Sequence, residues 1–194
     1  MRIIIATHNQ HKIQEIKELL KDPQITVQGL DGLGYHEALV EDQSSFIGNA
    51  RQKAQAIATI FPQDFVVADD SGFCVKALDM KPGVYSARFL GENEDDLAKN
   101  LKILELLENK SDRRALFCCA VHIQYKGQGI DVIEEVFGQV SEKLLGDRGF
   151  GYDPIFIPEG YEQSFAQIPE VKSIISHRAK AFRKVAQYVS FLTR

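Results

Sequence analysis

The sequence predicts an α/β fold built on a mixed, long-stranded sheet with helices around it. Residues 3–5 are three consecutive isoleucines, which is typical of a strand buried on both faces, and apolar residues then recur at helical spacing as far as Leu20. A long apolar stretch, 115–125, and a second strand pattern, 130–137, flank the segment Lys126-Gly127-Gln128-Gly129. That arrangement indicates a hairpin, so the sheet is expected to be at least partly antiparallel.

The other expected elements follow from the same periodicities. In chain order they are a strand at 25–27, a helix capped by Ser44 or Ser45 and reaching Ile57, a strand at 65–68, a helix at 97–107, a strand at 155–157 and a helix at 179–189. The chain has no repeat, low-complexity tract or linker, so residues 1–194 are expected to form a single domain.

Composition limits the possible functions. The net charge of −4 and the pI near 5.8 argue against an extended nucleic-acid surface. Three cysteines, Cys74, Cys118 and Cys119, lack metal-site spacing and are expected to be reduced core residues. No apolar run approaches the roughly 18 residues of a membrane span. We therefore expect a soluble, cytoplasmic protein that binds neither nucleic acid nor a membrane.

The polar run from Thr7 to Lys12 lies between the first strand and the first helix. The first N–H groups of a helix lack internal partners and, with the helix dipole, favour an anion. Lys12 would add a positive charge, so a phosphate site is one interpretation. The other is that Thr7 or Asn9 only caps the helix and Lys12 is solvated.

The segment Asp69-Asp70-Ser71-Gly72 follows an apolar strand. It is expected at the carboxyl end of that strand, where open α/β sheets bind ligands, with the two carboxylates pointing to opposite faces. Together with Glu41 and Asp42, such oxygens would suit Mg²⁺ beside a phosphate. An exposed turn is the alternative, because all four residue types favour turns.

Two further segments contain candidate binding residues. In Phe150-Gly151-Tyr152-Asp153 an aromatic ring could stack on a base and Asp153 could accept a hydrogen bond; the alternative is a turn whose aromatics pack in the core. Lys172, His177 and Arg178 precede the last helix, where cations oppose the helix dipole unless an anion is bound. The alternative there is a solvated basic loop.

Other chemistries have weaker support. His8 and His11 are not part of an HExxH motif, which disfavours a zinc site. Ser71 lacks the GxSxG context of a nucleophile elbow, which disfavours acyl transfer.

Several blocks together resemble the inosine/xanthosine triphosphate pyrophosphatase family. They are spread in the family's order from about residue 3 to residue 182, and they read ATHNQHK, FIGNARQKA, ADDSGFCVKAL followed by PGVYSARF, FGYDPIF and SHRAKAF. The resemblance implies two lobes with a central cleft, a homodimer, and Mg²⁺-dependent hydrolysis of non-canonical purine nucleoside triphosphates, ITP, dITP and XTP, to the monophosphate and pyrophosphate. The expected partner is thus a small nucleotide.

The resemblance also assigns site residues. It implies that Asp70 is catalytic and that Asp70 and Glu41 bind the metal. The substrate-binding residues that it implies, together with their neighbours in the first turn, are Thr7, His8, Asn9, Gln10, His11, Lys12, Lys53, Ser71, Phe150, Gly151, Tyr152, Asp153, Lys172, His177 and Arg178.

Two departures from the family pattern affect the metal site. The family usually carries two glutamates before the second helix where this chain has Val40-Glu41, and a glutamate where this chain has Gly48. Both changes remove negative charge, so a regulatory module that binds a nucleotide without hydrolysing it stays an alternative. A pyrophosphatase acting on modified pyrimidine or methylated nucleotides is another.

A mechanism follows from these assignments. Asp70 is expected to deprotonate the attacking water, while Lys12, Lys53 and Lys172 neutralise the triphosphate. Arg178 or a backbone N–H is expected to donate to the 6-oxo group that distinguishes hypoxanthine and xanthine from adenine.

Overall fold

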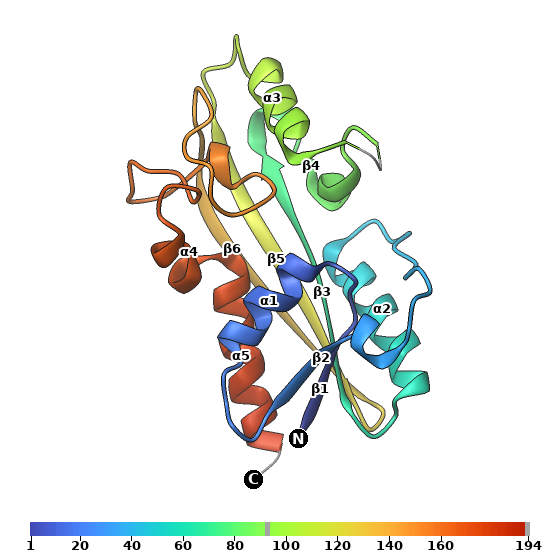
Figure 1. Cartoon of the computed structure of the whole chain (residues 1–194). Helices are drawn as coiled ribbons and strands as arrows, with labels where there is room; N and C mark the ends of the chain where they lie inside the picture. Colours follow the sequence, from blue (N-terminus) through green and yellow to red (C-terminus); the bar gives the residue numbers. More distant parts are fainter. Residues whose placement is uncertain (92–93, 193–194) are drawn as a thin grey trace. The chain divides into compact units, whose positions relative to one another are not determined.

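The computed structural model describes residues 1–91 and 94–192. Its strands and helices are β1 (Arg2–Ile5), α1 (Gln10–Leu19), β2 (Thr26–Gly29), α2 (Phe46–Ile60), β3 (Phe65–Val75), β4 (Lys81–Pro82), α3 (Asp96–Leu106), β5 (Arg114–Tyr125), β6 (Gln128–Val140), β7 (Phe156–Pro158), α4 (Pro169–Ile175) and α5 (His177–Leu192) (Figure 1). Short 3₁₀ turns lie at Asp31–Leu33, Lys76–Leu78, Gly83–Arg88 and Asp153–Ile155. None of the helices in these described ranges is long and apolar enough to cross a membrane.

The strands form one mixed seven-stranded sheet. Its order is β2-β1-β3-β5-β6-β7, with β4 paired to β3. β1 runs parallel to both β2 and β3, whereas β7 is antiparallel to β6 and β4 is antiparallel to β3. The expectation of a mixed α/β fold with helices around a long-stranded sheet is therefore confirmed.

The chain divides into two compact units. The first comprises 1–70, 119–134 and 178–194, and the second comprises 71–118 and 135–177. Strands β3, β5 and β6 each pass from one unit into the other, and each unit has its own core.

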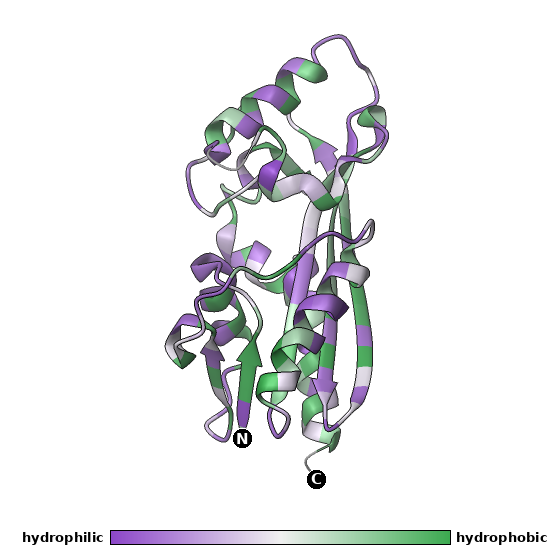
Figure 2. Ribbon diagram, turned by 90° about the vertical axis from the view of Figure 1, so that its right-hand side faces the viewer, coloured by the Kyte–Doolittle hydropathy of each residue, from purple (hydrophilic) through white to green (hydrophobic). Residues whose placement is uncertain are grey.

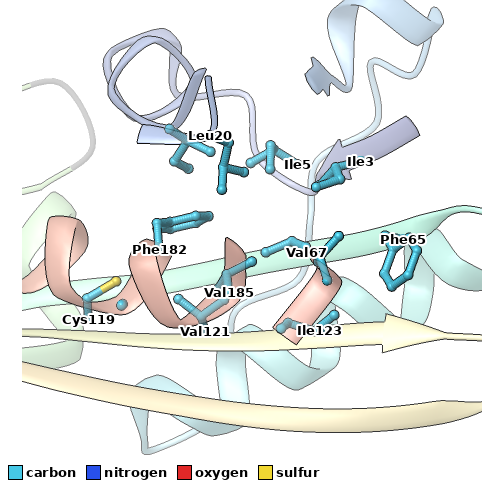
Figure 3. Packing of buried hydrophobic residues seen from close by; sticks show 13 residues of the cluster. Ile3, Ile5, Leu20, Phe65, Val67, Cys119, Val121, Ile123, Phe182 and Val185 are labelled. Carbon is cyan, nitrogen blue, oxygen red and sulfur yellow. The ribbon is translucent and has the colours of Figure 1, made fainter. Parts of the chain in front are cut away.

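The first unit buries both faces of its part of the sheet. Ile3 and Ile5 pack on one face against α1 and α5, and Ile4 packs on the other face against α2. In Figure 3, Phe182 and Val185 of α5 approach Ile5 from across that first face. Figure 2 shows the corresponding pattern, since β1 is hydrophobic along its length apart from its first residue. The isoleucine run was correctly predicted as a doubly buried strand.

The second unit has an aromatic core. Phe73 of β3, Phe117 of β5 and Phe156 of β7 contact one another with ring centroids 4.9–5.9 Å apart, and α3 adds Ile103 to the same cluster. The rings meet in tilted and edge-to-face arrangements, which suit their quadrupoles.

Helix α3 exists as predicted, but the leucines at helical spacing are not all buried. Leu97 and Leu101 are 53% and 50% exposed, whereas Leu107, at the end of the same leucine series, is 0% exposed. Asn100 and Ile103 are buried instead, at 1% and 0% exposure. The polar Asn100 is accommodated because its side-chain amide hydrogen-bonds to backbone carbonyl groups.

The expected end of β3 was wrong. The strand continues for 11 residues to Val75, so Asp69 and Asp70 lie inside it and do not form an exposed turn. The neighbouring β1 ends earlier, with Ile5 opposite Val67. The aspartates therefore lie just past the carboxyl end of β1, which is where ligands bind in open α/β sheets.

Candidate active site

The turn after β1 is held by its own side chains. Asn9 caps α1 by accepting a hydrogen bond from the N–H of Lys12 at 3.1 Å, and its own N–H donates to Oγ1 of Thr7 at 3.2 Å. The capping interpretation is thus confirmed for Asn9. Lys12 is not solvated, because its Nζ lies 3.0 Å from Oδ2 of Asp69.

The histidines and the glutamine of this turn have different surroundings. His8 interacts through Nδ1 with Asp31 at 2.8 Å and through Nε2 with the carbonyl of Glu37 at 2.9 Å. Burial lowers the pKa of His8, but these two acceptors raise it more, so the net shift is upward. Gln10 donates to the same Asp31 at 2.7 Å, and His11 is exposed.

Asp69 is the centre of a buried ionic cluster in the first unit. Oδ2 of Asp69 accepts from Lys12, and the guanidinium of Arg178 lies 3.5 Å from the same atom. Arg178 also donates to Oε2 of Glu15 at 2.6 Å. Burial alone would raise the pKa of Asp69, but Lys12, Arg178 and Lys53 outweigh it and hold that pKa well below the usual range.

Asp70 has a different environment on the same strand. It is buried, and Nδ2 of Asn49 donates to its Oδ2 at 2.9 Å. Asn49 is itself oriented, because its Oδ1 accepts from the N–H of Gln43 at 2.9 Å. Burial raises the pKa of Asp70 above its ordinary value, even though Lys53, Lys12 and the bond from Asn49 lower it.

Lys53 connects this pair to the acidic loop before α2. Its Nζ donates to the carbonyl of Asp69 at 2.8 Å and pairs with Oε1 of Glu41. Glu41 is close enough to Asp70 for its charge to raise the pKa of Asp70 further. The structure therefore places Lys53, expected to bind phosphate, next to Glu41 and Asp70, the two expected metal ligands.

This cluster can accommodate a metal only together with other oxygen ligands. Among residues 1–91 and 94–192, no group of three or more His, Cys, Asp or Glu side chains is placed to hold an ion. Mg²⁺ does not require such a group, because it typically takes one or two carboxylates plus water and phosphate oxygens. Asp70 and Glu41 fit that pattern of ligands.

The second unit brings together another set of expected residues. Oδ2 of Asp153 accepts from the N–H of Phe150 at 3.0 Å and from Nζ of Lys172 at 2.7 Å. The same Nζ lies 4.6 Å from the centroid of the Phe150 ring, in cation–π geometry. We call residues 150–153 the 150–153 loop; Lys172 of α4 contacts it through Asp153 and Phe150.

Tyr152 packs in the core, which agrees with the alternative interpretation of this segment as a turn whose aromatic residues are buried. Its ring stacks on Phe73 at 4.9 Å and its hydroxyl donates to the carbonyl of Ser86 at 2.9 Å. Burial raises the pKa of the Tyr152 hydroxyl.

The basic segment before the last helix is neither a loop nor solvated. Lys172 lies in the short helix α4, and His177 and Arg178 open α5. All three are at most 7% exposed. His177 stacks on Phe117 with ring centroids 4.8 Å apart, and Ser71 is a half-buried residue of β3.

Sequence reasoning missed the contributions of two residues. Asn49 orients Asp70, and Glu15 binds Arg178. Asn49 lies in the FIGNARQKA block, one turn of helix before Lys53, so the signal was present. Glu15 gave no signal, because a glutamate on a helix is ordinarily a solvated residue.

The chain matches known proteins over nearly its whole length. A sequence model of the Ham1 family matches residues 3–188. A dITP/XTP pyrophosphatase of Zymomonas mobilis is 42% identical, over 95% of this chain and 90% of the relative, and one of Bacillus subtilis is 40% identical, over 95% and 94%.

Solved structures agree with this match. The Ham1 protein of Staphylococcus aureus superposes with a TM-score of 0.88 at 36% identity, and a HAM1 protein from Coxiella burnetii superposes with 0.86 at 32% identity. Each comparison covers 98% of both chains. The resemblance that the five sequence blocks indicated is confirmed, and the chain belongs to the Ham1 family.

Proposed function

We propose that this protein hydrolyses non-canonical purine nucleoside triphosphates, ITP, dITP and XTP, to the nucleoside monophosphate and pyrophosphate. Relatives named dITP/XTP pyrophosphatase share about two fifths of its sequence. The single observation that carries the proposal is the Asp70 carboxylate, which is buried, oriented by Asn49, and shifted toward a higher pKa. A carboxylate of this kind is suited to accept a proton near neutral pH.

The reaction assigns a role to each part of the first unit. The oxygen of water attacks the α-phosphorus, the bond to the β-phosphate oxygen breaks, and pyrophosphate leaves. Asp70 takes the proton from the attacking water. Asn49 keeps the Asp70 carboxylate oriented, and Lys12 and Lys53 bind phosphate oxygens as the negative charge spreads.

The backbone and side chains of the turn after β1 are proposed to contact the phosphates. Thr7 and Asn9 stabilise the turn, while His8 and Gln10 bind Asp31 and so hold the turn against the neighbouring 3₁₀ segment. His11 is proposed as an exposed contact.

We propose Mg²⁺ as the cofactor, held by Asp70 and Glu41. The charges around Asp69 and Asp70 support this assignment, because the cations there are balanced by at least as many carboxylates. The cations are Lys12, Lys53 and Arg178, and the carboxylates are Glu15, Glu41, Asp69 and Asp70. A triphosphate entering a site without surplus positive charge needs a further cation. When bound, a divalent ion neutralises charge on phosphate oxygens.

Base binding is proposed for a second group of residues. The Phe150 ring would stack on the purine, and Asp153, Lys172 and His177 would fix the surroundings of that ring. The side chain of Tyr152 would support the loop from the core. The peptide groups of Gly151 and Tyr152 would line the proposed base site. Ser71 is proposed as a further substrate contact.

Selection of the 6-oxo group is proposed for Arg178. Two carboxylates, Glu15 and Asp69, hold its guanidinium and would fix the directions of its N–H groups toward the base. Adenine presents an amine at the same position, which would leave two donors facing each other at a cost of about 1–3 kcal/mol.

We also propose that residues 1–194 act as one enzyme unit, in the cytoplasm and as a homodimer. The shared strands β3, β5 and β6 support a single functional domain. Three buried cysteines, Cys74, Cys118 and Cys119, suit a reducing compartment. Exposed apolar side chains such as Tyr85 and Leu97 offer a surface for a second copy, and light scattering on the purified protein tests this assembly.

A substrate panel tests the activity. Purified protein with Mg²⁺ is mixed with ITP, XTP, GTP or ATP, and ³¹P NMR identifies the products. We expect monophosphate and pyrophosphate from ITP and XTP, with GTP and ATP largely spared. Release of orthophosphate, binding without turnover, or preference for a modified pyrimidine or methylated nucleotide would contradict the proposal.

A further inference from the structure

The peptide groups of Gly151 are hydrogen-bonded to one helix. The Gly151 N–H donates to Oδ2 of Asp96 at 2.6 Å, and its carbonyl oxygen accepts from Nδ2 of Asn100 at 2.8 Å. Asp96 and Asn100 are four residues apart on α3, so they lie on the same face of that helix. Both backbone groups of a single loop residue are therefore held by α3.

The loop depends on such an attachment. Gly151 has φ +63° and Gly149 has φ +82°, both in the left-handed region that glycine adopts readily. Glycine also has the most conformational freedom to lose when a loop is ordered. Within the described part of the chain, a Cβ built on Gly151 would meet no atom within 4 Å apart from its chain neighbours, so no close contact on that side holds this residue.

Asn100 is an unusual choice for its position. It is 1% exposed, and its Oδ1 is buried without a hydrogen-bond partner among residues 1–91 and 94–192. Its Nδ2 donates to two carbonyl groups, those of Gly151 and Asp96, both at 2.8 Å. An apolar side chain would avoid the unpaired oxygen but could not hold the Gly151 carbonyl.

Gly151 lies between two loop residues with proposed roles at the base, Phe150 and Asp153. Phe150 carries the stacking ring, and Asp153 binds both the Phe150 N–H and Lys172. Fixing the peptide of Gly151 therefore fixes the direction in which the Phe150 ring points.

We propose that Asp96 and Asn100 are positioning residues that set the base selectivity by holding the 150–153 loop through Gly151. This inference rests on the proposed function. It adds two residues of α3 that would act on the nucleotide through the loop, without touching it.

The main test uses Asp96, whose side chain is 48% exposed, so its replacement leaves the core intact. Asp96→Ala removes the acceptor for Gly151, and Asp96→Asn retains an oxygen there. Asp95→Ala is the matched control, because the Asp95 side chain accepts from the N–H of Ala98 at 2.7 Å and caps the same helix.

In Asp96→Ala we expect KM for ITP to rise about tenfold with kcat little changed, because a contact equally present in ground and transition states is lost. The ratio of kcat/KM for ITP to that for ATP is expected to fall by about the same factor. Asp96→Asn is expected to restore both values, and Asp95→Ala to lower the melting temperature while leaving the ratio unchanged.

Hydrogen exchange gives a readout that does not depend on activity. In ¹⁵N-labelled protein the Gly151 amide is expected to exchange slowly, and faster in Asp96→Ala and Asn100→Ala but not in Asp95→Ala. If the wild-type protein does not hydrolyse ITP, the proposed function fails, and with it the selectivity role. If the wild type hydrolyses ITP but Asp96→Ala keeps the wild-type ratio, or if Gly151 is unprotected in the wild type, the positioning inference is overturned.

Discussion

Asp69 and Asp70 are consecutive residues of β3 whose carboxyl groups have pKa values shifted in opposite directions. Burial would raise both, but Lys12 and Arg178 lie at 3.0 and 3.5 Å from Oδ2 of Asp69 and lower its pKa strongly. In Asp70, burial prevails and the pKa rises, with Asn49 as its hydrogen-bond donor. Successive residues of a strand point to opposite faces, so one dipeptide can supply a permanent anion and a proton acceptor.

Asp70→Asn is expected to lower kcat for ITP by about 10²–10⁴-fold, because the general base is lost while the shape of the side chain is kept. Stability is not expected to fall. A folded pKa above the unfolded value means that ionised Asp70 is unfavourable in the folded state at neutral pH, and asparagine removes that charge. Steady-state kinetics and thermal unfolding at pH 7 check both parts. A variant with near-normal kcat would eliminate Asp70 as the base.

The pH profile of kcat gives a second check on Asp70. Its carboxyl must be ionised to accept a proton, so activity is expected to fall as the pH drops through its folded pKa. That pKa is raised above the ordinary aspartate pKa of 3.8, so the acid limb should lie above this value. The profile should be measured with saturating ITP and Mg²⁺. A kcat that stays constant down to pH 3.8 would contradict the assignment.

Asp69→Asn is expected to destabilise the fold by about 3–5 kcal/mol at pH 7, because Lys12 and Arg178 lose a buried partner. The folded pKa of Asp69 is depressed, so its contribution is present above the unfolded pKa of about 3.9 and is lost as the pH falls through the folded value. Urea unfolding at pH 7 and pH 3 should therefore show a smaller difference from the wild type at pH 3. Asp64→Asn, which breaks the exposed pair with Arg2, is the control and should have little effect.

Most of the fold could be predicted because hydrophobic periodicity fixes strands and helices locally. The isoleucines of β1 and the apolar face of α5 were identified in this way. The burial of Asn100 on α3 was not, because Leu97 and Leu101 fit the helical period better than Asn100 does, yet they are exposed. A buried asparagine is explained only by the carbonyl of Gly151, which is 51 residues away along the chain.

The site was less predictable, because its function depends on pairing between distant segments. The sequence indicated Lys12 and Arg178 as cations, but their partners Asp69 and Glu15 come from a strand and a helix far from Arg178 in the chain. Strand length was misjudged for a related reason. Asp, Ser and Gly favour turns locally, yet β3 continues through them, because it is also paired with the long strand β5, which the local sequence does not reveal.

Glu41→Gln is expected to raise the Mg²⁺ concentration needed for half-maximal ITP hydrolysis about tenfold or more, since one of two proposed ligand carboxylates loses its charge. Its pairing with Lys53 would also be lost. Asp42→Asn is the matched control, because the adjacent Asp42 binds Gln52 and Gln43 at the surface. Activity should be titrated with Mg²⁺ at fixed ITP. Equal Mg²⁺ requirements for the two variants would show that Glu41 is not a ligand.

Arg178→Ala and Arg178→Lys separate the structural role of this side chain from its proposed recognition of the base. Arg178→Ala leaves the buried Asp69 and the partly exposed Glu15 without their shared cation, so we expect a loss of roughly 3–5 kcal/mol in the free energy of unfolding. Arg178→Lys keeps a positive charge and should recover part of that loss. Lysine cannot, however, bind two carboxylates and still present an oriented N–H, because it lacks the planar fork of arginine.

The two variants should therefore differ in stability but agree in selectivity. In both, kcat/KM for ITP is expected to fall more than kcat/KM for ATP, by about tenfold or more, because only the 6-oxo base loses a donor. The comparison is made at a temperature where unfolding curves show both variants to be folded. If ITP and ATP lose activity by the same factor, Arg178 serves only to hold Asp69 and Glu15. Discrimination against adenine must then come from another donor, such as a backbone N–H.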